Sequence, residues 1–215
     1  MIKISILTLF PQLFYYFKKT SILGKKIKKK IIKMKLIKIK NKLGYKKIDK
    51  KPYNKNTSKI IEINFIIKII KKIKNKEKKK KIIIINTDPS GKQFNQKESL
   101  KLSNFDHVVI LCGRYEGIDS RLNFFINENY SIGNFILFGG ELPAMILIEA
   151  ISRNIILKKK VIEDESFSNK ILEEDNYSKP YKVLNFTIPK IKKKNNIEKT
   201  KSIRPDLIKK FIKKN

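Results

Sequence analysis

Two short, uninterrupted apolar runs constrain the fold of this 215-residue chain more than any other feature. Residues 81–86 read KIIIIN, and His107–Cys112 reads HVVILC. Short β-branched runs of this kind predict strands buried on both faces, which is typical of a parallel sheet. The polar stretch between them, at residues 93–103, has the composition of a helix. We therefore predict an α/β fold in which parallel strands alternate with helices.

The same alternation extends in both directions along the chain. Residues 2–9 predict another buried strand, which ends at Phe10-Pro11, and residues 12–19 begin a helix. Residues 60–74 have the periodicity of an amphipathic helix that packs on a sheet. Beyond the second apolar run, we expect a helix at residues 118–126, a short strand with a glycine-rich loop at residues 127–140, and a further helix at residues 141–153.

Three loops with turn or glycine residues accompany the predicted strands: TDPSG at 87–91, CGRYEG at 112–117 and SIGNFILFGG at 131–140. Ligands of open α/β sheets bind at the carboxyl ends of the strands. The chain has neither a GxGxxG nor a GxxxxGK[ST] motif, so a dinucleotide or P-loop site is not supported. Such loops can bind an adenine through backbone N–H and C=O groups. The alternative, that they are only tight turns between packed elements, stays open.

The distribution of arginine and glycine singles out the same window. Only four of the 51 basic residues are arginine, and three of them, with five of the eight glycines, lie between residues 113 and 153. The net charge of +32 makes nucleic acid the leading partner and an anionic membrane surface the second. General compositional drift toward lysine is the alternative source of this charge.

Several classes of protein are disfavoured by what the chain lacks. A single cysteine, Cys112, excludes an intrachain disulfide and fits a reducing, cytoplasmic setting. One histidine and one cysteine argue against a zinc site, and His107 at a strand start has the position of a structural residue. No apolar run is long enough for a transmembrane helix, and the first ten residues do not have the pattern of a signal peptide.

The composition changes after Arg153 and predicts a second domain. A lysine-rich link precedes the acidic segment at residues 161–165, and the last twenty residues are basic and helical in period. We predict an α/β domain at residues 1–160 and a small, mostly helical, basic domain at residues 166–215, joined by the acidic linker.

Several ordered motifs carry a specific resemblance. The segments GRYEGID (113–119), SIGNFIL (131–137) and GGELPAM (139–145) resemble the TrmD family of tRNA (guanine-N1)-methyltransferases, in the SPOUT or trefoil-knot superfamily. Weaker matches are SILTLFP (5–11), SILGK (21–25), DPSGKQFNQ (88–96), YSKPYKV (177–183) and KTKSIRPDL (199–207). The resemblance covers most of the chain and is strongest from about residue 82 to residue 180.

The resemblance implies a parallel sheet with a C-terminal trefoil knot that binds S-adenosylmethionine. It implies that backbone groups at Gly113 and in the segment from Ile132 to Leu137 hold the adenine, and that Glu116 lies near the positive charge of the donor. The full set of expected donor-binding residues is Gly113, Ile132, Gly133, Asn134, Phe135, Ile136, Leu137, Thr87, Pro89, Tyr115, Glu116, Gly139, Gly140 and Pro143.

The family works as a homodimer with sites at the interface. It methylates N1 of the guanosine at tRNA position 37, just 3′ of the anticodon, where a guanosine at position 36 precedes it. The resemblance therefore implies tRNA as the partner, a cytoplasmic enzyme of tRNA processing, and no membrane. It leaves the need for Mg²⁺ open.

The chemistry requires a base, because guanine N1 carries a proton at neutral pH. The family shows an aspartate directly before Ser-Phe, whereas here Glu165 precedes Ser166-Phe167 and Asp164 lies one residue earlier. Both acids remain candidates for the base. Glu165 is favoured because it occupies the position of the family's aspartate. Arg153 matches the family arginine that stabilises negative charge on the purine oxygen.

Two family segments are altered. Where the family has a glycine loop, residues 52–59 of this chain read PYNKNTSK. The family's GNHxxIxxWR stretch is missing between residues 188 and 200. Both departures concern tRNA positioning more than donor binding. Alternative functions are another knot-type RNA methyltransferase, a catalytically degenerate tRNA-binding protein and, from the amphipathic lysine-rich helix, a membrane-surface protein.

Overall fold

The computed structural model describes residues 1–39, 49–53, 59–134, 136–157, 172–173, 175–188 and 196–212. The chain divides into two compact units, Met1–Ile156 and Leu157–Asn215. Within the described residues, no helix combines the length and the apolar character needed to cross a bilayer.

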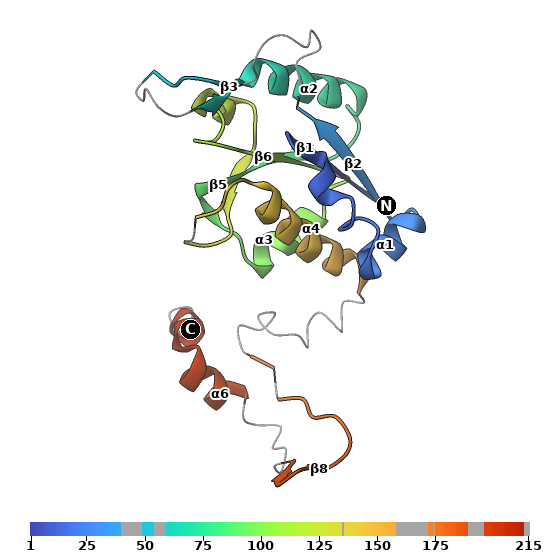
Figure 1. The fold of residues 1–215 in the computed structure, drawn as a ribbon, viewed down its shortest axis with the longest axis vertical. Coiled ribbons are helices and arrows are strands. Elements are labelled where there is room, and N and C mark those ends of the chain that lie inside the picture. Colours follow the sequence, from blue (N-terminus) through green and yellow to red (C-terminus); the bar gives the residue numbers. More distant parts are fainter. Residues whose placement is uncertain are drawn as a thin grey trace. The chain divides into compact units, whose positions relative to one another are not determined.

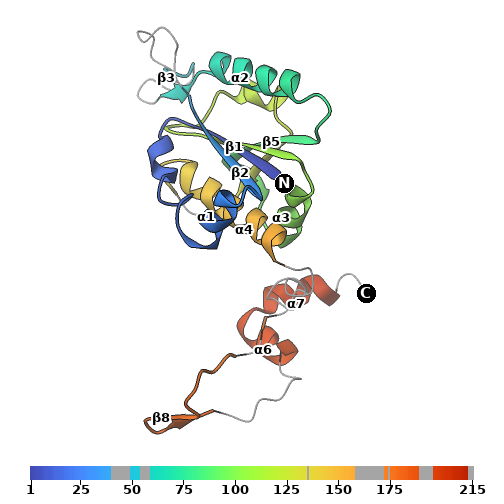
Figure 2. The ribbon, with the colours of Figure 1, turned by 90° about the vertical axis from the view of Figure 1, so that its right-hand side faces the viewer.

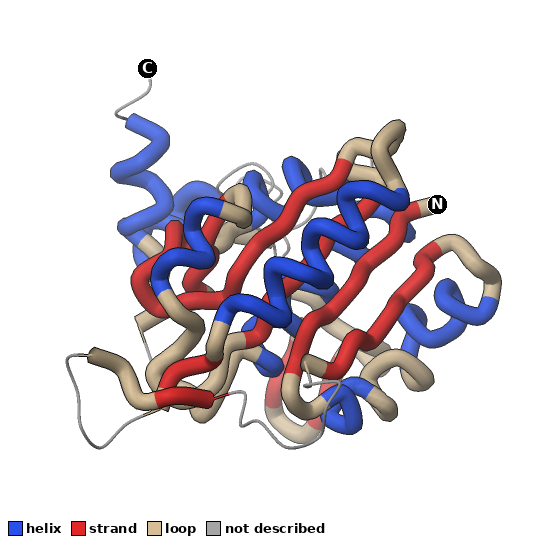
Figure 3. Tube along the Cα trace, turned by 90° about the horizontal axis from the view of Figure 1, so that it is seen from above, coloured by secondary structure: helices blue, strands red, loops and turns tan. Residues whose placement is uncertain are grey.

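The first unit is built on a five-stranded sheet in which every neighbouring pair is parallel (Figures 1 and 3). The strand order is β2-β1-β6-β5-β7. The strands are β1 (Ile2–Thr8), β2 (Ile32–Lys38), β5 (Ile82–Gln93), β6 (His107–Cys112) and β7 (Glu128–Ser131). The α/β fold with a parallel sheet, predicted from the two apolar runs, is confirmed.

Helices cover both faces of the sheet (Figures 1 and 2). One face packs on α2 (Ile63–Lys76), and the other packs on α1 (Ser21–Lys28), α3 (Gln96–Ser103) and α4 (Glu141–Ile156). All six residues of the central strand β6 are buried because side chains on both of its faces enter a core. This double coverage is the physical reason for its unbroken apolar sequence.

Two predicted helices are shorter than expected. Residues 12–19 form only the 3₁₀ turn η1 (Pro11–Phe14), in which Phe14 is the buried residue. Leu13, Tyr15 and Tyr16 are exposed, because apolar residues so close together in the sequence cannot all lie on one buried face of a helix. Similarly, the helix expected at residues 118–126 is the 3₁₀ turn η2 (Ser120–Phe124).

The strand pattern also differs from the sequence-based expectation. Residues 87–91 are not a turn, because β5 runs through them to Gln93 with a register shift between Thr87 and Lys92 where it pairs with β7. At the amino end of α2, Ile60–Ile61 form β4, which pairs with β3 (Asp49–Lys50). The edge strand β2 was not predicted, because its lysines alternate with half-buried apolar residues in a lysine-rich region.

The second unit contains a short hairpin and two helices. β8 (Lys182–Val183) pairs antiparallel with β9 (Phe186–Thr187). The helices are α6 (Asn196–Ile203) and α7 (Pro205–Ile212), in the segment where the sequence predicted helical periodicity. Thr200 of α6 and Ile208 of α7 are buried, and the Thr200 hydroxyl oxygen accepts a 2.9 Å hydrogen bond from the backbone N–H of Leu172.

Candidate functional site

A cavity of about 360 Å³ opens at the carboxyl ends of the central strands. Its walls come from four segments that are far apart in sequence: the second half of β5, the loop after β6, the end of β7 with the loop after it, and the residues that lead into α4. Parallel strands bring their carboxyl ends to one edge of the sheet, so the topology assembles this cavity.

A glycine pair allows the segment before α4 to lie directly against the end of β6. The Gly140 N–H donates a 2.8 Å hydrogen bond to the carbonyl oxygen of Gly113. A Cβ atom on Gly140 would lie 2.1 Å from the Thr87 hydroxyl and 3.0 Å from the Cα of Cys112. Only glycine therefore fits there without displacing the backbone that forms the cavity wall.

A buried carboxylate joins three loops behind the same wall. Glu141, the first residue of α4, is almost fully buried. It accepts 2.8 Å hydrogen bonds from the Thr8 hydroxyl and from Nε of Arg114. The Arg114 guanidinium also donates to the carbonyl oxygen of Phe138 at 3.3 Å and lies 4.7 Å from the centre of the Phe10 ring. The ends of β1, β6 and the 137–140 segment are thus held together.

The cavity combines apolar surface with carboxylate and backbone polar groups. Asp88 and Glu116 line it beside Leu137 and Pro143. Tyr115, also on the wall, has a φ of 60°, which turns the loop sharply after β6. A cavity of this size with a few polar groups suits a small organic ligand, and its two carboxylates favour a ligand with positive charge.

Most residues expected to bind a methyl donor lie together in this cavity. The lining includes eleven of them: Thr87, Pro89, Gly113, Tyr115, Glu116, Ile132, Gly133, Leu137, Gly139, Gly140 and Pro143. Two more, Asn134 and Ile136, are described but are not part of the lining, and the Ile136 side chain is fully exposed. Phe135 lies outside the described residues.

Of the residues expected to act on the target base, Arg153 is described and does not line the cavity. Arg153 lies in the last turn of α4 on its exposed side. It is ten residues beyond Pro143, which is about 15 Å along a helix axis. Glu165 and Asp164 lie outside the described residues.

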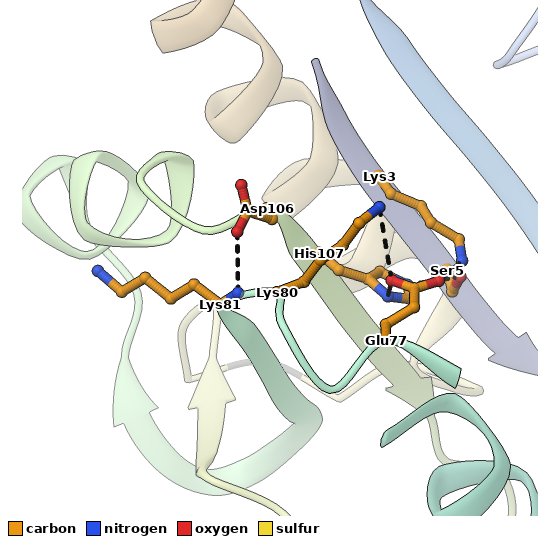
Figure 4. Close-up of polar contacts among 7 residues, drawn as sticks. All are labelled: Lys3, Ser5, Glu77, Lys80, Lys81, Asp106 and His107. Atoms are coloured by element: carbon orange, nitrogen blue, oxygen red, sulfur yellow. Dashed lines mark hydrogen bonds and ion pairs between the residues drawn. The ribbon is translucent and has the colours of Figure 1, made fainter. Parts of the chain in front are cut away.

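The only histidine lies at the opposite edge of the sheet, where strands begin (Figure 4). The buried imidazole of His107 has Nδ1 2.9 Å from a carboxylate oxygen of Glu77 and Nε2 2.8 Å from the Ser5 hydroxyl. Lys3 pairs with the same Glu77 carboxylate. Burial, and next the charge of Lys3, lowers the pKa of His107 below its usual value. This group joins α2 to the sheet and is closed to substrate.

The cysteine is also inert. Cys112 is completely buried at the end of β6, and burial raises the pKa of its thiol well above the usual value. A buried thiol of this kind is protonated at neutral pH and is not a nucleophile.

Sequence reasoning missed several residues of the cavity wall. They are Asn86, Asp88, Ser90, Arg114, Gly117, Ile118, Tyr130, Ser131 and Phe138. Most of these nine residues are sequence neighbours of a predicted residue. Their position near the carboxyl end of a strand could therefore have indicated that they line the cavity. Arg114 was noted as a rare arginine, but its pairing with Glu141, 27 residues away, has no local sequence signature.

Comparison with known proteins gives a consistent result. Residues 2–210 match the family model described as tRNA (Guanine-1)-methyltransferase TrmD. The tRNA (guanine-N(1)-)-methyltransferase of Malacoplasma penetrans (strain HF-2) is 32% identical over 229 residues, covering 99% of this chain and 100% of that protein. The protein of the same name from Buchnera aphidicola subsp. Schizaphis graminum is 35% identical, covering 97% of this chain and 86% of that protein. The protein of the same name from Campylobacter jejuni subsp. doylei is 39% identical, covering 83% of this chain and 78% of that protein.

Proposed function

This chain belongs to the TrmD family of tRNA (guanine-1)-methyltransferases, and from that premise we propose that it transfers a methyl group from S-adenosylmethionine to N1 of the guanosine at tRNA position 37. The observation that carries the proposal is the cavity at the carboxyl edge of the sheet, where the family motifs of three separate segments meet around Gly113 and Gly140.

The residues of the cavity fit the methyl donor. Backbone groups of Gly113 and of residues 132–137 would hold the adenine, since the tight Gly113–Gly140 contact brings main chain rather than side chains to the wall. The Glu116 and Asp88 carboxylates would attract the positively charged sulfonium and ammonium groups. Tyr115 and Leu137 supply apolar surface. When bound, the donor supplies an electrophilic methyl group.

The protein must also handle the proton on guanine N1. We assign its removal to Glu165 or Asp164, since either carboxylate can act as a general base. As the proton leaves, negative charge develops on the purine oxygen, and the Arg153 guanidinium would stabilise it. The arginine is suited to this because it stays charged at every relevant pH.

The position of Arg153 supports a homodimer as the active form. Within one chain, Arg153 is about 15 Å along α4 from the cavity residue Pro143. The same helix exposes Leu142 and Ile146, and Phe138 just before it is 96% exposed. A second copy packed on this apolar surface would bury it and could bring one chain's arginine to the other chain's donor cavity.

The remaining parts of the proposal follow family membership. The backbone contact between Gly113 and Gly140 is compatible with a trefoil knot formed by the segments around the donor cavity. Residues 166–215 would form the tRNA-binding domain, in which lysines attract the phosphate backbone. The cytoplasm, where tRNA is processed, is the proposed location.

Labelled S-adenosylmethionine tests the proposal when supplied with unmodified tRNA that has guanosine at positions 36 and 37. We expect label in this tRNA and none in a matched tRNA whose position 37 is adenosine. Equal labelling of the two tRNAs would contradict the assignment of position 37, and binding of tRNA without labelling would contradict enzymatic activity.

A further inference from the structure

The β8–β9 hairpin of the second unit has an apolar face (β8 in Figure 2). Val183 pairs with Phe186, and the backbone N–H of Ile188 donates a 3.1 Å hydrogen bond to the carbonyl of Tyr181. Opposite residues of an antiparallel pair, and residues two apart along a strand, point to the same side. Tyr181, Val183, Phe186 and Ile188 therefore share one face of the hairpin.

This face is open to solvent. Tyr181, Val183 and Phe186 are 66%, 57% and 78% exposed, and Leu184 at the tip is 84% exposed. Exposed apolar surfaces of this kind mark interaction sites.

The tip of the hairpin has a strained backbone. Leu184 has a φ of 52°, in the left-handed region that favours glycine. A bulky residue there is uncommon and costs conformational energy. A glycine at this position would relieve the strain but would remove the exposed leucine. The strained tip presents the leucine side chain to solvent, and strained backbone of this kind is concentrated at sites of ligand contact.

The charge around the hairpin indicates the kind of partner. From residue 176 to residue 197 the sequence has six lysines and neither aspartate nor glutamate. These lysines attract a polyanionic partner. RNA offers both matching chemistries, because its phosphates attract lysine and its unpaired bases present flat faces to aromatic rings.

We propose that the face formed by Tyr181, Val183 and Phe186 stacks on unpaired bases of an RNA loop, with Lys179 and Lys182 contacting the adjacent phosphates. This inference rests on the proposed function, in which the RNA is tRNA, and assigns the hairpin to its single-stranded loop nucleotides rather than to its paired stems. Aromatic stacking tolerates different bases, so the hairpin would add affinity without selecting a sequence.

The chain has no tryptophan, so Phe186→Trp in the full-length protein creates a single fluorescent reporter on this face. Stacking against a base quenches indole emission. We expect quenching by an RNA stem–loop with unpaired loop bases and little change with a blunt RNA duplex of equal length. Ile203→Trp, at an exposed position of α6, is the matched control and should respond weakly to both RNAs.

Affinity provides the second measurement. Tyr181→Ser with Phe186→Ser should weaken binding of the stem–loop about tenfold and that of the duplex less than twofold, while Lys182→Ala should weaken both alike. Unchanged stem–loop affinity, or equal quenching by both RNAs, would overturn the proposal. Tryptophan emission that changes with protein concentration alone would show a protein interface instead, which also overturns it.

The two proposals can fail separately. If the wild-type protein methylates tRNA but Phe186→Trp is not quenched by the stem–loop, the hairpin assignment is wrong and the enzymatic function stands. If the tryptophan is quenched but no methyl group is transferred, the hairpin assignment stands and the proposed function is wrong.

Discussion

Nε of Arg114 donates a 2.8 Å hydrogen bond to Oε2 of Glu141, the first residue of α4. The other carboxylate oxygen accepts from the Thr8 hydroxyl, so one buried acid fixes the ends of β1 and β6 against the start of α4. The residues after β6 and those that lead into α4 line the cavity, and the ion pair is therefore expected to determine its shape.

The first prediction concerns this pair. Arg114→Met leaves Glu141 buried without its cation, and we expect the free energy of unfolding to fall by about 2–3 kcal/mol, less than for a fully buried pair because Arg114 is partly exposed. Urea denaturation measures the change. Arg114→Met with Glu141→Leu removes both charges and should restore part of the loss. A double variant that is less stable than Arg114→Met would contradict this account.

The second prediction concerns the close approach at Gly140. Gly140→Ala would place a Cβ 3.0 Å from the backbone of Cys112 and Gly113, and we expect it to lower stability by about 1–3 kcal/mol. Gly113→Ala is the matched control, because the nearest atom to its Cβ would be 3.5 Å away. Thermal unfolding without ligand should show a clear loss for Gly140→Ala and little change for the control. Equal losses would refute the steric explanation.

The third prediction is a pH dependence from His107. Its pKa is lowered in the folded protein by burial and the charge of Lys3, so the unfolded chain binds the proton first. The stabilisation is complete above the unfolded value of about 6.5 and is lost as pH falls below it, at up to about 1.4 kcal/mol per pH unit.

Because His107 is the only histidine, the range from pH 6.5 to 5 reports on this residue more than on any carboxylate. Denaturant unfolding across this range should show a decline in the wild type and a flatter profile in His107→Gln. A variant that keeps the full decline would show that His107 is not its source, because the lowered pKa of Glu77 confines the contribution of that carboxylate to lower pH.

The fourth prediction separates donor binding from catalysis. Arg153→Ala should lower the rate of methyl transfer about 100-fold or more while leaving the dissociation constant of S-adenosylmethionine within about twofold, because Arg153 lies outside the donor cavity. Single-turnover kinetics and calorimetry measure the two quantities. A parallel loss of donor affinity would place Arg153 in the donor site itself.

The fifth prediction assigns the base. Glu165→Gln and Asp164→Asn are tested singly and together, and the variant that lacks the base should lose about 100- to 10,000-fold in single-turnover rate. We expect the larger loss for Glu165→Gln, because Glu165 occupies the position of the family's aspartate. If the double variant methylates tRNA at the wild-type rate, the base lies elsewhere.

The core of the fold could be predicted because its signals are local. The runs at residues 81–86 and His107–Cys112 consist of apolar residues that fit only strands covered on both faces. The topology of such a sheet then brings Thr87 of β5 and the loops containing Gly113 and Ile132 to one edge, and the structure places them around one cavity.

Other features depend on long-range packing and could not be read from the sequence. The residues that follow Pro11 are apolar, yet most of their side chains remain exposed and only a 3₁₀ turn forms. The pairing of Arg114 with Glu141 needs the full sheet to bring the two residues together. The hairpin around Leu184 has no glycine to mark its turn, so a left-handed leucine there was not expected.

The most direct test of the central claim is to identify the methylated atom. Unmodified tRNA with guanosine at positions 36 and 37 is incubated with the protein and S-adenosylmethionine, digested, and analysed by mass spectrometry with nucleotide mapping. We predict 1-methylguanosine at position 37 and at no other position. Methylation at another atom or nucleotide, or no methylation by protein that binds the donor and the tRNA, would contradict the account.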